Sequence, residues 1–533
     1  MKIEFVGGAR TVTGSSFIIK DHDFTIMVDC GMFQGKEELR NRNSLHLIYA
    51  PEEIDILLLT HAHIDHSGLI PKLVKEGFKG RIYATKATSD LCTIMLPDSA
   101  HIQEMDVKWR NRKNKRLERP LIPPLYTTED AENAMKYFIP VSYNETLQIH
   151  PRVKVRFRDA GHILGSAIIE MWVDEKGGGQ KKVVFSGDLG PKGQAIIRDP
   201  DIIEEADFLL IESTYGNRFH KSKESTFEEF KSIIIESAAK KGNIIVPAFA
   251  VERTQEIIYA LAKMVKNKEV PRIPVYIDSP LAASATDIFR ANSECFDRET
   301  LTMLTFGESP FDFDNLSFVR STEESKFLTK TAKGAMIISA SGMCTAGRIK
   351  FHLRENLYDP DSCVVFVGYQ AEGTLGRRLV DGAERVTLYG EDVLVKAKIH
   401  TLNGFSAHAD RKGLQEWVAN ISNPNLKIFV VHGETETAFD FASHIESMFH
   451  FSTYVPRWGE IIDLDTMHSE MASYGEDENY NAVDFELGSL YRLVDELKEK
   501  SKNVNNSIVD ENQIRQDLQD IKARLSRVRD KIM

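Results

Sequence analysis

The sequence predicts an α/β protein of two to four domains, and three observations lead to this prediction. The 533 residues exceed the length at which one hydrophobic core stops growing. A domain usually takes about 100–200 residues. Short apolar runs of strand length alternate with longer segments of helical periodicity. A composition of 42% hydrophobic and 27% charged residues is ordinary for a soluble protein, and no apolar run reaches the ~20 residues of a membrane span.

The first part of the chain, through about residue 215, has the pattern of a β-rich domain. Apolar segments of strand length recur in it, namely IDILLLT, RVKVRFRDA, AIIEMWVD and KKVVFSGD. The turn KGGGQ separates the last two segments, so we expect them to form a hairpin. This pattern predicts a first domain built largely of strands.

The middle of the chain, from about residue 216 to 385, alternates between helices and strands. The segments TFEEFKSIIIESAAKKG and RTQEIIYALAKMVKN have helical periodicity, whereas NIIVPAF, IPVYIDSP, AMIISASG and CVVFVGY are continuous apolar runs. Fully apolar strands with helices between them predict a parallel sheet that is covered on both faces. From residue 386 to about 465 the sequence is expected to be rich in strands again, and LKIFVVHGE is the clearest of these.

The segment 466–533 differs in kind from the rest. MHSEMASYGEDENYNA is polar and acidic, as in a linker, and apolar residues then recur at spacings of four and three from Ile514 to Ile532. This heptad-like helix can pack on its own chain or on a second copy. We predict that it contributes to a homodimer.

Net charge and cysteine content narrow the class of protein. A formal charge of −12 argues against coating nucleic acid by bulk electrostatics, so any such contact needs a local basic patch. KWRNRKNKRLER, residues 108–119, is such a patch, with seven cationic residues and Trp109; a solvated helix face and a nucleic-acid contact are both open for it. Five cysteines without C-x-x-C pairing, and no visible secretory signal, predict reduced thiols and a cytoplasmic protein.

Three histidines and an aspartate crowd the stretch LLLTHAHIDHSG, directly after an apolar run. His61 and His63 are two residues apart, which in an extended backbone directs both side chains to one face. Asp65 and His66 follow where the chain must turn, so the two pairs are expected to serve two neighbouring metal ions. Packing gives no reason for this concentration of imidazole and carboxylate.

Further ligand candidates stand at the ends of other apolar strands: His162 in RDAGHILGS, Asp188 in VVFSGDLG and His432 in IFVVHGE. Because strand ends at one edge of a sheet converge, we expect these side chains near the HAHIDH stretch. A set of imidazole and carboxylate ligands without thiolate suits Zn²⁺ best, with Mn²⁺ or Fe²⁺ as alternatives where a site is open.

The sequence closely resembles the metallo-β-lactamase superfamily, whose H-x-H-x-D-H signature is HAHIDH at residues 61–66. Further motifs of that superfamily are matched by Asp29 in FTIMVDCGMFQG, by His162 and by Asp188. The motifs that mark its β-CASP nucleases are also present: Glu212 in LLIESTYG, His408 in GFSAHAD and His432 in VVHGE. The resemblance covers nearly all of residues 1–460.

This resemblance implies an α/β fold with a four-layer αββα sandwich and two zinc ions per chain. Residues 1–212 and 386–465 would form the sandwich, with a β-CASP α/β domain inserted at 213–385 and a helical tail at 466–533. The ligands of one zinc would be His61, His63 and His162, and those of the other Asp65, His66 and His432. Asp188 would bridge the two ions, and Asp29 would orient the ligand loop.

The resemblance also implies a ribonuclease that cleaves single-stranded RNA, since histidine at the position of His432 goes with RNA substrates in the family. A metal-bridged hydroxide would attack phosphorus, and His408, held by Glu212, would protonate the leaving 3′-oxygen, giving 5′-phosphate and 3′-hydroxyl ends. Endonucleolytic cleavage is favoured over 5′-to-3′ exonuclease action. A small-molecule hydrolase of thioesters or lactams and a noncatalytic scaffold are the competing interpretations.

Substrate contacts are expected from segments that follow apolar strands. SASGMCTAGRIKFHL offers Ser341, Gly342 and Arg348 where backbone N–H groups at a helix start can hold a phosphate. EGTLGRR offers Arg377 and Arg378, and VPAFAVERTQE offers Arg253. For each arginine an ordinary ion pair within the protein is the competing interpretation.

Overall fold

The computed structural model describes residues 1–472 except 45–46, 48, 369, 371–372 and 403. Within this part, Met1–Met471 forms one compact unit. The heptad-like helix of residues 514–532 lies outside the described residues, so its role in a homodimer stays a prediction.

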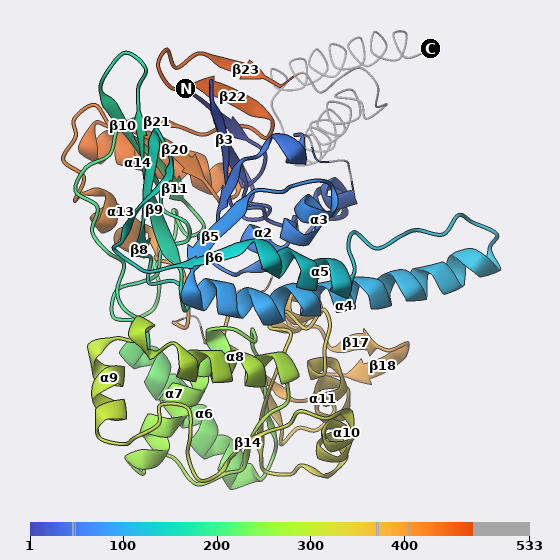
Figure 1. Ribbon diagram of the computed structural model, residues 1–533. Coiled ribbons are helices and arrows are strands. Elements are labelled where there is room, and N and C mark those ends of the chain that lie inside the picture. Colours follow the sequence, from blue (N-terminus) through green and yellow to red (C-terminus); the bar gives the residue numbers. More distant parts are fainter. Residues whose placement is uncertain (45–46, 48, 369, 371–372, 403, 473–533) are drawn as a thin grey trace, which may run out of the picture. The chain divides into compact units, whose positions relative to one another are not determined.

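Two β-sheets pack face to face (Figure 1). Apolar side chains from the inner faces of both form one core, in which Phe5 and Ile26 of the first sheet meet Phe157 and Phe429 of the second. The first sheet has the order β23 (Ser469–Met471), β22 (Glu460–Asp463), β1 (Lys2–Phe5), β2 (Phe17–Asp21), β3 (Phe24–Val28), β4 (Ile56–Leu58), β5 (Arg81–Thr85), β6 (Phe138–Val141). The second has the order β21 (Ser452–Tyr454), β20 (Lys427–Val431), β11 (Phe208–Glu212), β10 (Gln180–Phe185), β9 (Ala167–Asp174), β8 (Val153–Asp159), β7 (Thr146–His150).

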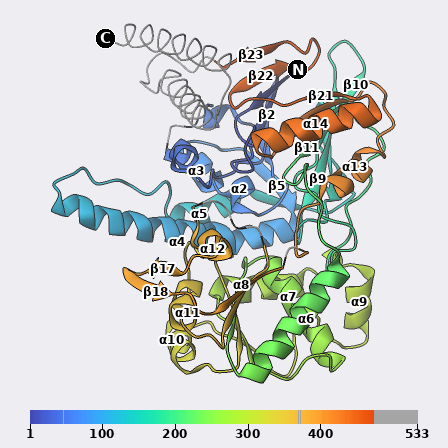
Figure 2. The same cartoon turned by 180° about the vertical axis from the view of Figure 1, so that it is seen from behind.

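Helices cover the outer face of each sheet, which completes the predicted αββα sandwich (Figure 1 and Figure 2). On the first sheet lie α2 (Ile64–Ser67), α3 (Ile70–Lys75), α4 (Lys86–Arg116) and α5 (Thr128–Ala134); on the second lie α13 (Arg411–Val418) and α14 (Thr435–Phe449). The expectation that residues 386–465 are mainly strands is therefore wrong in part. The repeat of buried Ala438, Phe441, Ala442 and Ile445 in α14 is helical and stands in the sequence.

The segment between β11 and α13 forms a separate parallel sheet, as predicted, with helices on both faces. Its strand order is β14 (Leu316–Phe318), β13 (Val275–Ile277), β15 (Met336–Ser339), β12 (Ile244–Pro247), β16 (Cys363–Phe366), β19 (Lys398–Thr401). One face is covered by α6 (Lys223–Lys240), α7 (Arg253–Lys266) and α8 (Pro280–Ala291), the other by α10 (Thr322–Thr331), α11 (Ile349–Asn356) and α12 (Leu375–Val380). Helix α9 (Arg298–Thr305) and the ribbon β17 (Arg385–Leu388) and β18 (Glu391–Leu394) complete the segment.

The composition change at residue 385 does not coincide with a break in this inserted sheet. Strand β19 pairs in parallel with β16 and forms its last strand, so the sheet continues to Thr401. A short polar strand of this kind, KIHT, gives little signal in the sequence because only one side of it is covered by a neighbouring strand.

The strands predicted for the first part of the chain are all present. The segments around the KGGGQ turn pair in antiparallel fashion as β9 and β10, which confirms the expected hairpin. All five cysteines are buried and free, in agreement with the expected reduced thiols. Within the described residues, no helix combines the length and apolar character that crossing a membrane requires.

Candidate metal centre and active site

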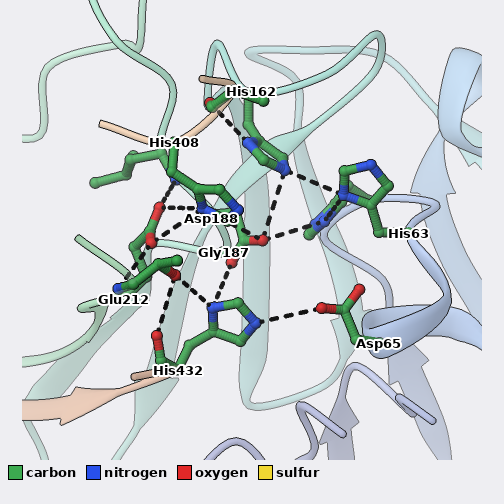
Figure 3. A network of polar contacts seen from close by, with 12 residues as sticks. His63, Asp65, His162, Gly187, Asp188, Glu212, His408 and His432 are labelled. Carbon is green, nitrogen blue, oxygen red and sulfur yellow. Dashed lines mark hydrogen bonds and ion pairs between the residues drawn. The ribbon is translucent and has the colours of Figure 1, made fainter. Parts of the chain in front are cut away.

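The HAHIDH stretch spans the loop after β4 and the start of α2, at the edge where several strands of both sheets end. The Nε2 atoms of His61 and His162 lie 3.2 Å and 3.1 Å from Nδ1 of His63. His162 comes from the loop between β8 and β9, almost a hundred residues further along the chain. The structure thus brings these three imidazoles to one point. Figure 3 shows His63 and His162 there.

A second group of ligand candidates lies beside the first and consists of Asp65, His66 and His432. The Nε2 atoms of His66 and His432 are 3.2 Å apart, and Asp65 Oδ2 lies 3.6 Å from Nε2 of His432. His432 follows directly on β20, which pairs in parallel with β11. The C-terminal part of the sandwich therefore supplies one member of this group.

The carboxylate of Asp188 lies between the two groups (Figure 3). Its Oδ2 atom is 3.5 Å from His61 Nε2 and 3.6 Å from His162 Nε2. Its Oδ1 atom is 3.4 Å from His66 Nε2 and 3.3 Å from His432 Nδ1. Each oxygen thus faces one group, which is the arrangement that a bridging ligand requires.

The separations of these side chains and an unpaired carboxylate oxygen among them suit bound divalent cations. Imidazole nitrogens on a single tetrahedral Zn²⁺ ion lie about 3.3 Å apart, close to the separations among His61, His63 and His162. Asp188 Oδ1 is buried and has no hydrogen-bond partner among the described residues. Such an atom is costly to leave unpaired, so a cation is the partner that the site lacks within the protein.

The protonation states of His61, His63 and His162 also suit metal binding. Burial, followed by the neighbouring imidazoles, lowers the pKa of His61 and His162 well below 6.5, and burial lowers the pKa of His63 to about 4. These rings are neutral at pH 7 and keep a lone pair for a metal. Burial alone would raise the pKa of Asp188, but His432 and His66 outweigh it and hold that pKa well below 3.8. This cluster of imidazoles and carboxylates meets the chemical requirements of a site for divalent cations.

Hydrogen bonds behind the ligands fix which ring nitrogen faces the centre. Nδ1–H of His61 donates to Thr60 Oγ1 at 3.0 Å, and the Thr60 hydroxyl donates to Asp29 Oδ2 at 2.8 Å. Nδ1–H of His66 donates to the same Asp29 oxygen at 2.8 Å. For His162 the acceptor is the backbone carbonyl of Ala407, also at 2.8 Å. Each bond leaves Nε2 free toward the metals.

Two of these supporting contacts were missed from the sequence. Thr60 could have been inferred as the polar residue between the apolar run and His61, whereas a carbonyl such as that of Ala407 leaves no signal in the side chains. A third residue, Glu252, is buried at the start of α7 in the inserted segment. Its Oε2 atom accepts a hydrogen bond from the backbone N–H of Leu164, two residues after His162, at 3.0 Å.

His408 and Glu212 form a pair next to Asp188 (Figure 3). Nδ1 of His408 lies 3.2 Å from both oxygens of the Glu212 carboxylate, which is fully buried at the end of β11. Burial alone would lower the pKa of His408, but Glu212 and then Asp188 outweigh it and raise the pKa to about 9. Cations bound at Asp188 would act in the opposite direction, because their charge disfavours a neighbouring imidazolium.

The cluster is buried on most sides and open on one. His61, His66, His162, Asp188 and Glu212 are buried, whereas His63, Asp65 and His408 are only partly covered. The side chain of His408 retains 21% of its exposure and that of Asp65 retains 23%. A substrate therefore meets His63, Asp65 and His408 first.

The expected substrate-side residues have partners within the protein. The guanidinium of Arg348 donates to Asp278 Oδ1 at 2.7 Å, and Arg253 pairs with Glu256. Arg377 donates to Asp381 at 2.9 Å. The hydroxyl of Ser341, next to Gly342, accepts the N–H groups of Thr345 and Ala346 at 3.1 Å and 3.2 Å. These contacts match the competing interpretation for Arg253, Arg348 and Arg377, an ion pair within the chain.

A four-layer αββα sandwich that carries clustered imidazole and carboxylate ligands at one edge defines a metal-dependent hydrolase. Three family models match the chain: the metallo-beta-lactamase superfamily at residues 9–128, the Beta-Casp domain at 254–379, and the Zn-dependent metallo-hydrolase RNA specificity domain at 392–456. The chain belongs to the β-CASP family of the metallo-β-lactamase superfamily.

Characterised relatives match over most of the chain. It is 37% identical to Ribonuclease TTHA0252 of Thermus thermophilus over 436 residues, which cover 82% of this chain and 94% of that protein. It is 32% identical to Transcription termination factor FttA of Methanococcus maripaludis over 470 residues, which cover 86% of this chain and 70% of that protein. The same factor of Methanocaldococcus jannaschii is 30% identical over 466 residues, with 86% and 70% covered.

Proposed function

We propose that the protein is a ribonuclease that hydrolyses phosphodiester bonds of single-stranded RNA with two bound divalent cations. The observation that carries the proposal is the pair of His408 and Glu212 beside Asp188, because it adds a proton donor to the metal ligands. A match to an RNA specificity domain at residues 392–456, which include His408 and His432, supports RNA as the substrate. The name of the Thermus relative, a ribonuclease, points the same way.

The ligand groups indicate where each cation would bind. His61, His63 and His162 would hold one, Asp65, His66 and His432 the other, and Asp188 would contact both. Zn²⁺ is the ion that this ligand set favours, and Mn²⁺ is the alternative. Bound cations of this kind make water nucleophilic at neutral pH and neutralise charge that develops on a phosphoryl group.

The side chains at the open face perform the remaining steps. Glu212 accepts Nδ1–H of His408 and so fixes the ring, which leaves Nε2–H as the proton to give. Transfer of that proton to the leaving 3′-oxygen would yield a 3′-hydroxyl, and the other product would carry a 5′-phosphate. The buried Glu212 carboxylate also stabilises the imidazolium before transfer, since it is the nearest carboxylate to Nδ1 in the part of the chain that the structure describes.

Replacing His408 by alanine tests this assignment. His408→Ala should lose RNA hydrolysis by about 10²–10⁴-fold, the usual contribution of a general acid. It should keep the metal content of the wild type, because His408 belongs to neither ligand group. His432→Ala is the matched control and should lose metal as well as activity. Full activity of His408→Ala would remove His408 from the mechanism.

We propose endonucleolytic cleavage. RNA substrates that differ in their 5′ ends, or that have no ends, test this mode of cleavage. Linear RNA with a 5′-triphosphate, linear RNA with a 5′-monophosphate and circular RNA should all be cut by an endonuclease. A 5′-to-3′ exonuclease would leave the circle intact. Turnover of a thioester or lactam in place of RNA would instead assign the site to small-molecule hydrolysis.

The homodimer and the cytoplasmic location also stay proposals. Removing the residues after Ala472 keeps strand β23, in which Glu470 pairs with Lys2 at 2.8 Å. If the tail drives dimerisation, this truncation should halve the mass measured by light scattering. An unchanged mass would exclude the tail as the dimer contact.

A further inference from the structure

Helix α4 extends well beyond the part that the core needs. Its buried residues end at Ala100, although the helix continues to Arg116. Every residue from His101 to Leu125 is partly or fully exposed, until Tyr126 enters the core. In two opposite views the C-terminal half of α4 and the chain that follows project past the surrounding ribbon (Figure 1 and Figure 2). We call residues 101–125 the arm.

The arm is an ordered element although none of its residues is buried. The side chain of Asn111 donates to the carbonyl of Ile122 at 2.8 Å and accepts its N–H at 3.0 Å. Asn114 donates to the carbonyl of Pro120 at 3.1 Å. These bonds tie the returning segment to the helix, so the helical face opposite to them is held in a fixed position.

Positive charge on the arm is not neutralised within the described part of the chain. Its cations are Lys108, Arg110, Arg112, Lys113, Lys115, Arg116 and Arg119, and none of them forms an ion pair with a described carboxylate. Elsewhere exposed lysines are often paired, as Lys263 is with Glu299 at 2.7 Å. The arm also carries three carboxylates, Glu104, Asp106 and Glu118, so its seven cations leave an excess of positive charge. In a chain of net charge −12 this local excess favours a polyanion.

An exposed aromatic side chain lies within this charge. Trp109 is 68% exposed and stands between Lys108 and Arg110. Ile102 and Met105, at 43% and 51% exposure, precede it at spacings that place all three on one side of the helix. A tryptophan among cations is the arrangement that stacks on bases while the cations hold the phosphates. An apolar stripe alone would also suit a protein partner, but seven cations around it favour RNA.

The other end of α4 lies against the metal centre. The hydroxyls of Thr85 and Thr88 donate to the carbonyl of Gly165 at 2.6 Å and 2.8 Å, in the loop that carries His162. From there the 31-residue helix spans roughly 45 Å at ~1.5 Å per residue. A single strand of RNA would need about 13 nucleotides to cover that distance at ~3.4 Å per nucleotide.

We propose that the arm binds single-stranded RNA by its phosphates and bases, at a distance from the catalytic centre that α4 fixes. The proposal rests on the function proposed above and adds a second contact site for the same substrate. RNA that reaches both sites should bind more tightly than RNA that reaches the centre alone, because the second contact becomes intramolecular.

The test removes charge from the arm without disturbing the helix. In Lys108→Gln/Arg110→Gln/Arg112→Gln, glutamine keeps the helix propensity, and none of these side chains is buried. Binding of a single-stranded RNA of roughly 30 nucleotides, measured by fluorescence anisotropy in the inactive His408→Ala background, should weaken about 100-fold at 0.1 M salt. The slope of log K against log salt should become shallower by about 2, at ~0.7 for each lost phosphate contact.

Trp109 supplies a second, uncharged test. Trp109→Ala should weaken binding about 5- to 150-fold with an unchanged salt slope, because base stacking does not release counterions. Trp109→Phe should retain most of the affinity. The matched control is Lys326→Gln/Lys330→Gln/Lys333→Gln, which removes three exposed lysines on and after α10 that form no ion pair with described carboxylates. This control changes the net charge by the same amount as the triple arm variant, and it should leave the RNA affinity and the salt slope unchanged.

Cleavage by the otherwise wild-type protein separates this proposal from the proposed function. With RNA of about 6 nucleotides, too short to reach the arm, the arm variants should match the wild type; with the long RNA their KM should rise. Unchanged affinity and slope in the triple variant would overturn the proposal and leave the surface to a protein partner. Equal losses on short and long RNA, or in the α10 control, would overturn it too. Failure of the wild type to cut either RNA would instead refute the proposed function.

Discussion

Asp29 is expected to set the affinity of the site for metal without touching a metal itself. Its side chain is buried, and its hydrogen-bond partners among the described residues are all donors: Thr60 N–H to Oδ1, and the Thr60 hydroxyl and His66 Nδ1–H to Oδ2, each at 2.8 Å. Asp29→Asn keeps the shape but replaces one oxygen by an NH₂ group. In either orientation of the amide, this group meets a donor.

The size of the effect follows from these bonds. One hydrogen bond to a charged, buried acceptor is worth about 1.5–3 kcal/mol. If the NH₂ group faces His66, the ring loses the acceptor that holds its proton on Nδ1. The proton can then move to Nε2, which takes away the lone pair that would bind the metal. At ~1.4 kcal/mol per factor of ten, metal affinity should fall about 10- to 100-fold, which is the usual cost of losing such a partner.

The assay is a competition titration with a chromophoric chelator, combined with elemental analysis of the purified protein. Circular dichroism would show that Asp29→Asn is folded. Asp207→Asn is the matched control, because that carboxylate also accepts a backbone N–H, from Lys182 at 2.8 Å, at the end of β11 away from the metal centre. Equal metal affinity of Asp29→Asn and the wild type would refute the argument that Asp29 fixes the His66 ring.

Two further predictions concern the support of the ligand loops. Burial, followed by repulsion from Glu256, raises the pKa of Glu252 from 4.5 to about 8. Between these two pH values the folded state binds more protons than the unfolded chain, so the free energy of unfolding falls as the pH rises. Glu252→Gln should therefore raise the midpoint of thermal unfolding relative to wild type by an amount that grows from pH 5 to pH 8, and a gain that is equal at both would contradict this cause. In Gly31→Ala the new Cβ would lie 1.7 Å from the carbonyl oxygen of Asp65, which must move, so metal content by elemental analysis should drop. The control Gly177→Ala, with open space around the new Cβ, should keep its metal. Wild-type metal content in Gly31→Ala would contradict the prediction and show that the ligand loop shifts at no cost.

The convergence of the candidate metal ligands could largely be predicted because they are local in sequence or end apolar strands. His61, His63, Asp65 and His66 lie within six positions, and Asp188 and His432 each follow a run of buried residues. Their convergence follows from the register of parallel strands: β10 pairs with β11, and β11 pairs with β20 so that Glu212 stands opposite Val431. The strand end thus brings Glu212 and His432 to the same edge.

The contacts between side chains could not be predicted in the same way. Arg348 follows an apolar strand, as a phosphate-binding residue would, but its partner is Asp278, which is seventy positions earlier and fully buried. The sequence shows both residues and gives no sign that they meet. The helices α13 and α14 were missed for a different reason, since the apolar strand β20 between them dominated the pattern of that region.

The inserted segment also takes part in building the candidate metal centre. His162 lies before the insertion in sequence, yet its ring is oriented by the carbonyl of Ala407, after the last strand of the inserted sheet. Its loop is held at Leu164 by Glu252, from the start of α7. This candidate metal ligand therefore takes its position from one residue of the insert and from the segment that directly follows the inserted sheet. A chain ending before residue 213 would keep the HAHIDH stretch and lack both supports of His162, so metal affinity and the folding of the insert are coupled.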